Sequence, residues 1–292
     1  MMKSECVAII GASGLVGSSL VAFLREQGHE VIPISRKERD GWRVYGDGCI
    51  QGATVVINMS GETVNQRWNT AAKLRILNSR VDTTNEIAKW IRQTSENDRP
   101  HTWLNASAVG FYGDRGDECL DEKSTGGDGF LADVCKQWES TAEAASDVTR
   151  VVCLRVGVVL AKQSKAWKKM VTPFKLGVGG KISTGRQWFP WIHIDDLVGM
   201  IIHAMHTPSI KGAMNGTAKQ PVTNIEFTHA LGEALKKPTC IPAPAFALRM
   251  LLGEFANAVL SSYRVDPKVA TDTGYHFKYA SINEAIDALL EK

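Results

Sequence analysis

A glycine-rich segment near the N-terminus has the spacing of a dinucleotide-binding turn. The apolar run Cys6 to Ile10 leads directly into Gly11-Ala12-Ser13-Gly14-Leu15-Val16-Gly17. In such a turn the first glycine reverses the chain, the second lets the backbone approach a pyrophosphate, and the third lets a helix pack on the strand. The free N–H groups of that helix attract phosphate. The segment predicts a Rossmann-type site with Gly11, Ser13, Gly14, Leu15, Val16 and Gly17 as cofactor-binding residues, the alternative being a plain turn without a ligand.

Basic residues follow the second predicted strand, Val31 to Ile34. An NAD-binding protein usually carries an acid here to hold the ribose 2′-hydroxyl, but this chain has Ser35 and Arg36, with Lys37 and Arg39 nearby. A guanidinium pairs with a 2′-phosphate in two-point geometry, whereas a carboxylate would repel it. The sequence therefore predicts NADP(H), with Ser35 and Arg36 in contact with it. The alternative is a solvated basic loop.

The elements that must position this turn alternate along the first 155 residues. Short apolar runs alternate with helical patterns, which is typical of a parallel sheet covered on both faces. The predicted strands are Cys6–Ile10, Val31–Ile34, Ala53–Met59, Thr102–Ala108 and Arg150–Val156, and the predicted helices include Leu15–Gln27 and Thr70–Gln93. The predicted fold class is α/β, a Rossmann-type doubly wound parallel sheet.

After Val156 the pattern becomes mostly helical. Helices are predicted at 164–176 and 195–205, a glycine-rich loop at 177–187, and two further helices behind the capping boxes Thr223/Glu226 and Ser281/Glu284. Prolines 238, 242 and 244 indicate an extended connector. We expect an NADP-binding domain from residues 1–160 and 190–235, and a small, mostly helical C-terminal substrate domain from 161–189 and 236–292.

Composition excludes several classes of function. A net charge of +3 over 292 residues is too small to indicate nucleic acid or a membrane surface. Six cysteines without a C-x-x-C pair argue against zinc, so no metal site is predicted. No apolar run reaches the ~18 residues of a membrane span, and nothing before the first strand resembles a leader. A cytoplasmic protein with reduced thiols is expected.

Four further segments carry a resemblance to a known family. They are Ile57-Asn58-Met59-Ser60-Gly61-Glu62, Ala106-Ser107-Ala108-Val109-Gly110-Phe111-Tyr112-Gly113, Leu154-Arg155-Val156-Gly157-Val158-Val159-Leu160 and Phe189-Pro190-Trp191-Ile192-His193-Ile194-Asp195-Asp196-Leu197. Together with the glycine turn they resemble an atypical branch of the extended short-chain dehydrogenase/reductases, the NADP-dependent sugar-nucleotide epimerase family with its own C-terminal domain. Some relatives have been connected with cell or plastid division.

The resemblance implies further cofactor-binding positions. Ser60 and Gly61 would lie beside the adenine ribose and pyrophosphate of the cofactor. Arg80 would face the cofactor from the next helix. Val156, Gly157 and Val158 would lie near the nicotinamide, as would Ala108. Each has a plainer alternative: an ordinary turn at Ser60 and Gly61, a surface charge at Arg80, and packing alone at the valines.

The superfamily's acid/base pair, a Tyr with a Lys four residues later, is missing. The matching helix, Phe130 to Ala145, places Leu131 and Cys135 at those positions, and neither can move a proton in that way. The candidate catalytic residues are therefore Ser107, as the hydroxyl that polarises a carbonyl, and Tyr112, as a substitute acid. Ala108 could instead occupy the serine slot, and Tyr112 could be a packing aromatic.

Four other residues are expected to have structural or solvent-exposed roles. Cys135 is more simply a buried small residue than a nucleophile, and Lys136 should face solvent. His193 should be structural, with Asp195 capping the following helix.

A stretch without acids suggests the substrate. From Val148 to Ile194 there is no Asp or Glu, and the stretch contains Arg150, Arg155, Lys162, Lys165, Lys168, Lys169, Lys175, Lys181 and Arg186. A local positive field suits a small anionic substrate such as a nucleotide sugar, although a solvated basic face is the alternative.

Three functions are compatible with these observations. The first is an epimerase or reductase that works by hydride transfer, as a monomer or homodimer. The second is a catalytically silent NADP(H)-binding regulator, possible because the Tyr/Lys pair is absent. The third is a reductase of an uncharged metabolite, for which the basic stretch would be irrelevant.

Overall fold

The central element is a parallel sheet of seven strands. The computed structural model describes residues 4–291. The strand order is β11-β7-β5-β4-β1-β2-β3, and every pairing in it is parallel. The bounds are β1 Cys6–Ile10, β2 Glu30–Ser35, β3 Arg43–Val44, β4 Val55–Asn58, β5 Thr102–Ala108, β7 Arg150–Val156 and β11 Gly212–Gly216. The order reverses beside β1, the place where an open α/β sheet binds its ligand.

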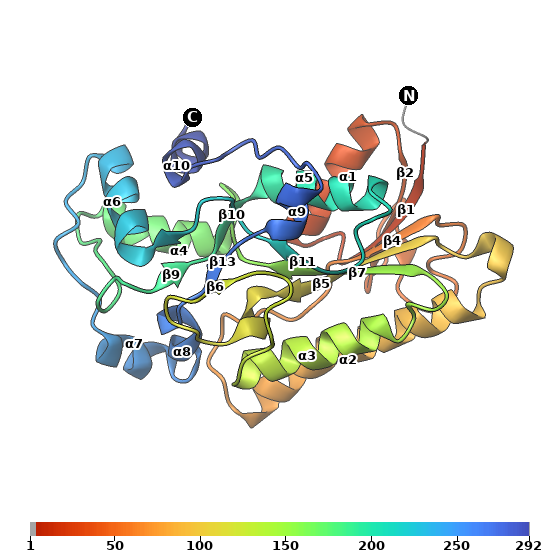
Figure 1. Ribbon diagram of the computed structural model, residues 1–292, viewed down its shortest axis with the longest axis horizontal. Helices are drawn as coiled ribbons and strands as arrows, with labels where there is room; N and C mark the ends of the chain where they lie inside the picture. The colour runs from red at the N-terminus through yellow and green to blue at the C-terminus, as the bar shows by residue number, and fades with distance from the viewer. Residues whose placement is uncertain (1–3, 292) are drawn as a thin grey trace.

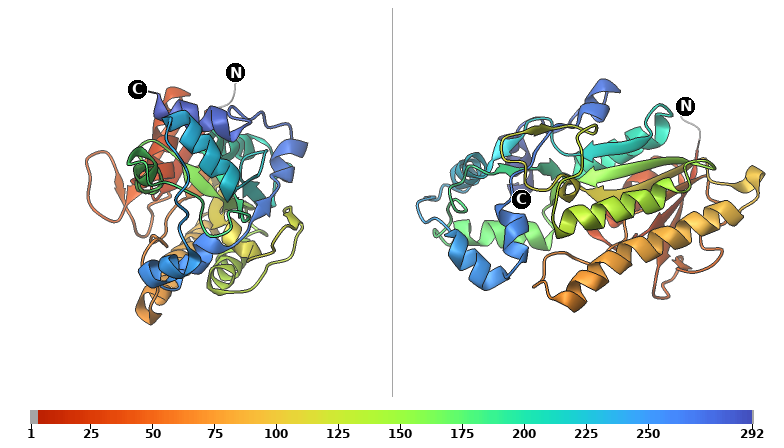
Figure 2. Two further views of the ribbon diagram at one scale, coloured as in Figure 1. Left: turned by 90° about the vertical axis from the view of Figure 1, so that its left-hand side faces the viewer. Right: turned by 60° about the horizontal axis from the view of Figure 1, so that its bottom comes forward.

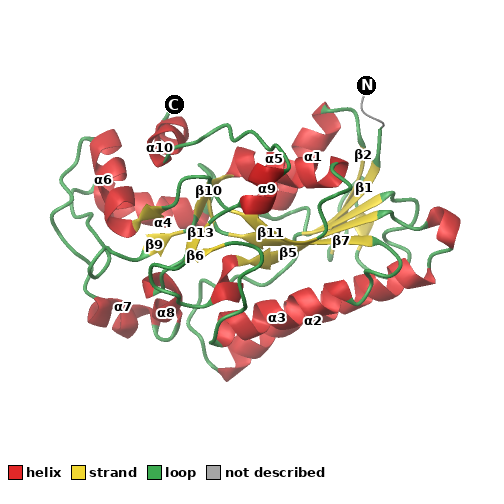
Figure 3. Ribbon diagram, in the orientation of Figure 1, coloured by secondary structure: helices red, strands yellow, loops and turns green. Residues whose placement is uncertain are grey.

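Helices cover both faces of this sheet. On one side lie α1 (Leu15–Glu26) and α5 (Ile194–His206), and on the other lie α2 (Thr70–Gln93) and α3 (Phe130–Glu143) (Figure 1). Each face has its own buried apolar cluster, with Leu20 and Met200 in one and Ile87 and Trp103 in the other. Figure 3 shows the strands as one layer between the helices. The predicted doubly wound α/β fold is confirmed.

A second lobe carries the shorter elements. Its helices are α4 (Lys165–Lys175), α6 (Asn224–Leu235), α7 (Ala245–Leu252), α8 (Phe255–Leu260), α9 (Lys268–Asp272) and α10 (Ile282–Leu290). Three two-stranded pairs accompany them: β8 (Val158–Leu160) with β10 (Trp191–His193), β9 (Trp188–Phe189) with β12 (Val222–Thr223), and β6 (Cys119–Leu120) with β13 (Arg264–Val265). Two 3₁₀ turns, η1 (Glu96–Asp98) and η2 (Val109–Tyr112), lie in the first lobe.

The second lobe has its own core, built by α4, α6 and α10. Trp167, Phe174, Phe227, Leu231 and Ile286 are buried together there. Helix α6 lies beside α4 and α10, away from the main sheet (Figure 2). The expected division placed residues 224–235 with the cofactor domain. The apolar face of α6 packs in the second core instead, because it is there that Phe227 and Leu231 find apolar partners.

Two of the three helix caps predicted from the sequence are formed, and the third lies at a different residue. Both predicted capping boxes, at Thr223 and Ser281, are formed. The N-cap of α5, however, is His193, whose Nδ1 accepts the Asp195 N–H at 3.1 Å, so the prediction that Asp195 caps this helix is wrong. The Asp195 carboxylate instead pairs with Lys278 Nζ at 2.7 Å.

A buried carboxylate fastens the C-terminal segment to α5. Asp196 is 1% exposed, and its oxygens accept the Lys278 N–H at 2.7 Å, the Tyr279 N–H at 3.0 Å and the Tyr275 hydroxyl at 3.1 Å. The chain from 275 to 279 is thereby held on the first turn of α5. Among residues 4–291, no helix has the length and apolar content needed to cross a bilayer.

Candidate functional site

The turn after β1 is closed by glycines that tolerate no side chain. Gly11 has φ +81°, and a Cβ there would lie 2.8 Å from the Met59 carbonyl and the Ser60 nitrogen at the end of β4. A Cβ on Gly17 would lie 2.3 Å from the Gly11 oxygen. The packing roles expected for Gly11 and Gly17 are confirmed, since one lets the chain turn against β4 and the other lets α1 begin against the turn.

The N-terminus of α1 presents free amides beside this turn. Gly14 is the N-cap and supplies no capping side chain, and the first turn contains no acid. In the described chain, the N–H groups of Leu15, Val16 and Gly17 have no backbone acceptor. A Cβ on Gly14 would meet only the Gly11 oxygen, at 3.2 Å, and Ser13 and Gly14 are exposed. Unpartnered amides at an exposed helix N-terminus fit a pyrophosphate.

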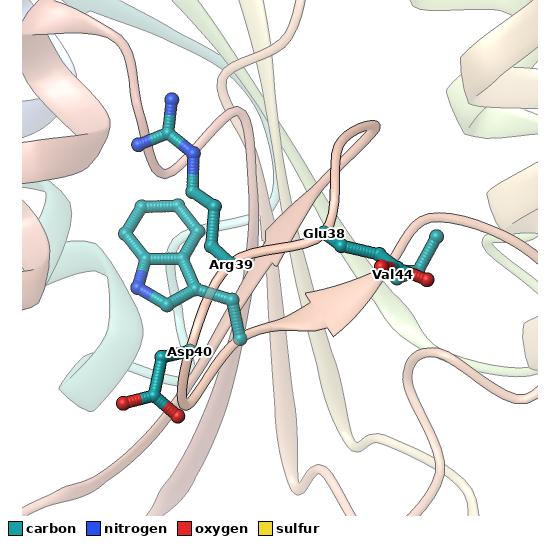
Figure 4. A pocket seen from close by; sticks show the side chains of 5 residues that line it. Glu38, Arg39, Asp40 and Val44 are labelled. Atoms are coloured by element: carbon teal, nitrogen blue, oxygen red, sulfur yellow. The ribbon is translucent and has the colours of Figure 1, made fainter.

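The loop between β2 and β3 brings cations and acids to the same edge. Arg36 is exposed and makes no hydrogen bond or ion pair with the described residues, while the Ser35 hydroxyl accepts the Lys37 N–H at 3.2 Å. A shallow pocket here is lined by Glu38, Arg39, Asp40, Trp42 and Val44 (Figure 4). The Arg39 guanidinium lies 5.0 Å from the Trp42 ring centre. Two carboxylates, Glu38 and Asp40, therefore lie among the cations of this loop.

Arg80 is a partly buried cation rather than a surface charge. Its guanidinium carbon lies 3.1 Å from a Cβ built on Gly61, and it stacks 5.1 Å from the Trp138 ring centre. Nη1 donates to the Ile76 carbonyl at 2.9 Å, and no carboxylate of the described chain lies within ion-pair distance. Burial lowers the pKa of Arg80. A desolvated cation without an acid suits an anionic or oxygen-rich ligand beside Gly61.

Ser60 is positioned by the end of β4. Its hydroxyl donates to the Asn58 Oδ1 at 2.6 Å, and Asn58 Nδ2 in turn donates to Asn105 Oδ1 at 2.8 Å. The buried amides of β4 and β5 therefore fix the loop that carries Ser60 and Gly61. Neither asparagine was singled out from the sequence, where a lone Asn in an apolar strand gives no specific signal.

Ser107 belongs to a buried ionic network. The residue is 3% exposed, and its hydroxyl donates to Glu139 Oε1 at 2.5 Å. Glu139 accepts two bonds from Arg155, at 2.9 and 2.8 Å, and both side chains are buried. The hydroxyl is thus turned toward α3 and is already donating its proton. Ala108, the next residue, is only half-buried.

Tyr112 extends the same network and is not an accessible acid. It is fully buried, and its hydroxyl donates to Asn215 Oδ1 at 2.7 Å and accepts from Arg155 Nη1 at 3.0 Å. Burial raises the pKa of Tyr112 to about 12. The prediction of Tyr112 as a substitute acid is wrong, because desolvation and its partners Asp121, Asn215 and Arg155 hold it away from any ligand. The packing alternative fits the structure.

The positions of the missing Tyr/Lys pair are apolar. A Cβ on Gly110 would lie 3.1 Å from Leu131 Cβ and 3.9 Å from Cys135 Sγ. Cys135 is buried, and desolvation, followed by the charge of Glu139, raises its pKa to about 12, so it is no nucleophile at neutral pH. Lys136 does not simply face solvent as expected. The 124–129 loop folds over α3, and Lys136 Nζ donates to the Gly127 carbonyl at 2.5 Å.

The residues assigned near the nicotinamide lie at the same sheet edge. Ala108 and Val156 are register partners at the ends of β5 and β7, and Val156 to Val158 are half-buried. A Cβ on Gly157 would lie 2.1 Å from the Pro190 carbonyl, so this glycine allows the close approach of the 190 segment. The valines are therefore packed on one side and partly exposed on the other.

Part of the acid-free stretch is internal. Arg150 donates to the carbonyls of Ala204 and Met205 in the last turn of α5 and to that of Ile210 beyond it. Arg155 is paired with Glu139. The exposed cations of α4 are Lys165, Lys168, Lys169 and Lys175. The positive field is therefore weaker than the sequence suggested. No group of three or more possible metal ligands occurs in residues 4–291.

The sheet order, the glycine turn and the free α1 amides define a Rossmann-type protein built like the extended short-chain dehydrogenase/reductases. Residues 7–215 match the profile of the NAD dependent epimerase/dehydratase family, and residues 243–289 match a domain of unknown function, DUF1731. The chain belongs to the NAD dependent epimerase/dehydratase family.

Relatives match along nearly the whole chain. A chloroplastic homolog of Epimerase family protein SDR39U1 from Arabidopsis thaliana is 36% identical, over 98% of this chain and 86% of its own. Epimerase family protein YfhF of Bacillus subtilis is 33% identical, over 97% of each chain.

Two solved structures are similar in fold and sequence. Human epimerase family protein SDR39U1 (isoform 2), solved with NADPH, has a TM-score of 0.91 and 33% identity over 97% of this chain and 98% of that chain. A nucleoside-diphosphate sugar epimerase from Corynebacterium glutamicum has a TM-score of 0.83 and 35% identity, over 99% of this chain and 58% of that chain.

Proposed function

We propose that this protein binds NADP(H) across the carboxyl edge of the sheet, with the pyrophosphate on the N-terminus of α1. The observation that carries the proposal is the row of unpartnered amides at Leu15, Val16 and Gly17 beside the open Gly14. The NADPH in the human relative supports the choice of cofactor.

Different residues around the turn would contact different parts of the cofactor. Ser35 and the unpaired Arg36 would take the 2′-phosphate, while Ser60, Gly61 and Arg80 would line the path of the ribose and pyrophosphate. Ala108 and the half-buried segment from Val156 to Val158 would border the nicotinamide. When bound, the nicotinamide would supply a hydride donor or acceptor.

We further propose an epimerase or reductase activity on a small anionic substrate such as a nucleotide sugar. The substrate would lie between the two lobes, and the name of the Corynebacterium relative favours this class. Ser107 and Tyr112 are buried and committed to Glu139 and Asn215, so neither would protonate the substrate. The proton would therefore come from water rather than from a side chain of the usual pair.

A catalytically silent NADP(H)-binding regulator is the second candidate. It is favoured by the apolar pair Leu131 and Cys135 at the acid/base positions and by the inward turn of Ser107. Such a protein would keep the cofactor site and respond to the state of the NADP(H) pool.

One experiment separates the two candidates. NADPH is titrated by its fluorescence, and the loaded protein is then incubated with nucleotide sugars and simple carbonyl compounds while nicotinamide absorbance and product stereochemistry are followed. Conversion of any nucleotide sugar supports the enzyme. Tight NADPH binding without conversion supports the regulator, and failure to bind NADPH would overturn the proposal as a whole.

A further inference from the structure

A second pocket lies in the second lobe, away from the cofactor turn. It is formed by α6, the 177–187 loop and the connector that follows α6, and polar side chains of Lys181, Thr228, His229, Thr239 and Cys240 line it. Helix α6 lies at the left end of Figure 1, far from α1. The cavity measures about 220 Å³. At ~30 Å³ per water, it has room for a small organic or inorganic ion.

Backbone pairing brings the pocket's two walls together. Gly180 forms an antiparallel bridge with Cys240, and Ile182 forms a bridge with Ala243. The Ala243 N–H donates to the Lys181 carbonyl at 2.9 Å. Lys181 and Cys240 therefore lie on adjacent segments joined by isolated backbone bridges, although they are far apart in the sequence.

Lys181 is a positioned cation without a carboxylate partner. A Cβ on Gly185 would lie 3.2 Å from both the Cβ and the Cδ of Lys181, so the stem of the lysine is packed on this glycine. Lys181 is half-buried and forms no ion pair with any described residue. The residues lining the pocket include Lys181 and His229 but no Asp or Glu. A packed stem and an unpaired ammonium favour an anion at low entropic cost.

Thr228 supplies the second observation. The residue is 2% exposed and lines the cavity, yet its hydroxyl makes no hydrogen bond in the part of the chain that the structure describes. A helical threonine can bond the carbonyl one turn back, but Thr228 does not. The fully buried side-chain atoms without a partner do not include its hydroxyl, which therefore keeps contact with the cavity. A hydroxyl left free in a cavity beside a lysine is available to a ligand oxygen.

We propose that this pocket binds a small oxyanion, a phosphate or carboxylate group, between the Lys181 ammonium and the Thr228 hydroxyl. His229 and Thr239 complete the polar wall, and the exposed Cys240 thiol lies at the same site. The site is separate from the NADP(H) turn and does not depend on the function proposed above.

The thiol of Cys240 allows a direct test on the whole protein. Iodoacetate and iodoacetamide have nearly the same shape and differ in charge, and each loses iodide to the attacking thiolate. Peptide mass spectrometry follows their rates at Cys240 and at Cys119, an exposed thiol outside the pocket. We expect Lys181→Met to lower the iodoacetate-to-iodoacetamide rate ratio at Cys240 by about three- to fivefold, the size expected for one partly screened charge. The ratio at Cys119 should not change.

Inorganic phosphate provides the second arm. It should slow iodoacetamide at Cys240 but not at Cys119, and Thr228→Val, which keeps the shape of the side chain, should weaken this protection. Lys168→Met on exposed α4 is the matched control for loss of a charge and should alter neither rate. If Lys181→Met exposes the buried Cys153 to alkylation, that variant is misfolded and Thr228→Val decides. An unchanged rate ratio in folded Lys181→Met, or no selective protection of Cys240 by phosphate, would overturn the proposal.

Discussion

At the scale of single residues, the cation after β2 should decide which dinucleotide binds. Arg36 is exposed and unpaired among the described residues, so its guanidinium is free for a 2′-phosphate. We expect Arg36→Asp to weaken NADPH binding by about tenfold or more, the loss of a charge-assisted contact, and to change NADH binding far less. Fluorescence titration with both nucleotides measures the difference. Equal weakening of the two would show that Arg36 does not contact the 2′-phosphate.

The buried pair of Glu139 and Arg155 should contribute more to stability than any surface pair. Glu139→Gln would leave the Arg155 guanidinium buried without its counter-charge, at a cost of about 3 kcal/mol or more in the free energy of unfolding. The matched control is Glu118→Gln, which breaks the more exposed pair with Arg115 and should cost less than about 1 kcal/mol. Urea unfolding compares the two, and similar losses would contradict this assignment.

The glycine turn was predictable residue by residue, and the orientation of Ser107 was not. A glycine allows a close backbone approach because it lacks a side chain, so its spacing in the sequence is enough to predict the turn. Ser107 faces Glu139 because α3 places a carboxylate one turn beyond Cys135, a tertiary contact that no local pattern encodes. Tyr112 was ambiguous for the same reason, since its burial depends on Asn215 in a strand a hundred residues away.

At the scale of elements, two glycines of one turn should behave differently. Gly17→Ala forces a Cβ against the Gly11 carbonyl and should lower the free energy of unfolding by about 1–3 kcal/mol. Gly14→Ala has almost enough room and should change stability by less than about 1 kcal/mol, yet weaken NADPH binding by about tenfold. Thermal unfolding and NADPH titration of both variants check this, and a folded Gly14→Ala that binds normally would argue against a pyrophosphate at this turn.

Helix α5 should lose stability in acid. Burial lowers the pKa of His193, so below about pH 6.5 the unfolded chain binds more protons than the folded one. The contribution of neutral His193 to the free energy of unfolding is therefore complete above that pH and is lost as the pH falls. The N-cap has the same requirement, because only a neutral Nδ1 can accept the Asp195 N–H.

The variant His193→Asn keeps a capping side chain that does not titrate. Urea unfolding from about pH 7.5 to about pH 5.5 should show a smaller loss in the variant than in the wild type. Some acid dependence should persist from His203 and His206, whose pKa values are also lowered by burial. An identical loss in the variant would show that His193 does not contribute.

Periodicity predicted the positions of the long strands and helices well, and β11, one of several elements it missed, shows its limit. The strands β1, β5 and β7 and the helix α2 have the predicted bounds. Strand β11 has the sequence Gly-Ala-Met-Asn-Gly, which lacks the branched apolar residues of a strand, and it forms because β7 offers an open edge for parallel pairing.

At the scale of the whole molecule, Asp196 should govern how the C-terminal segment stays docked. Asp196→Ala removes the acceptor for Tyr275, Lys278 and Tyr279, and should cost about 3 kcal/mol or more. Hydrogen exchange should rise at 275–279 and stay low in β1. The control Asp195→Ala removes an exposed pair with Lys278 and should have little effect. Unchanged exchange at 275–279 in Asp196→Ala would contradict this role.

The arrangement of the two lobes could be predicted only in part from the sequence. Proline and glycine positions marked the connector, but the membership of α6 in the second core depends on which apolar faces meet in space. Residues 160 to 289 contribute to that core from several distant segments. Periodicity shows that a helix has an apolar face and does not show which partner buries it.

The contact between Arg80 and Trp138 of α3 also bears on which side chains position 135 can hold. The charge of Arg80 acts on Cys135, where the superfamily's lysine would stand. The substitution Cys135→Lys would place an ammonium in a buried space near the Arg80 guanidinium, and the two like charges would repel each other. A lysine at position 135 would therefore be tolerated only together with the loss of the Arg80 charge.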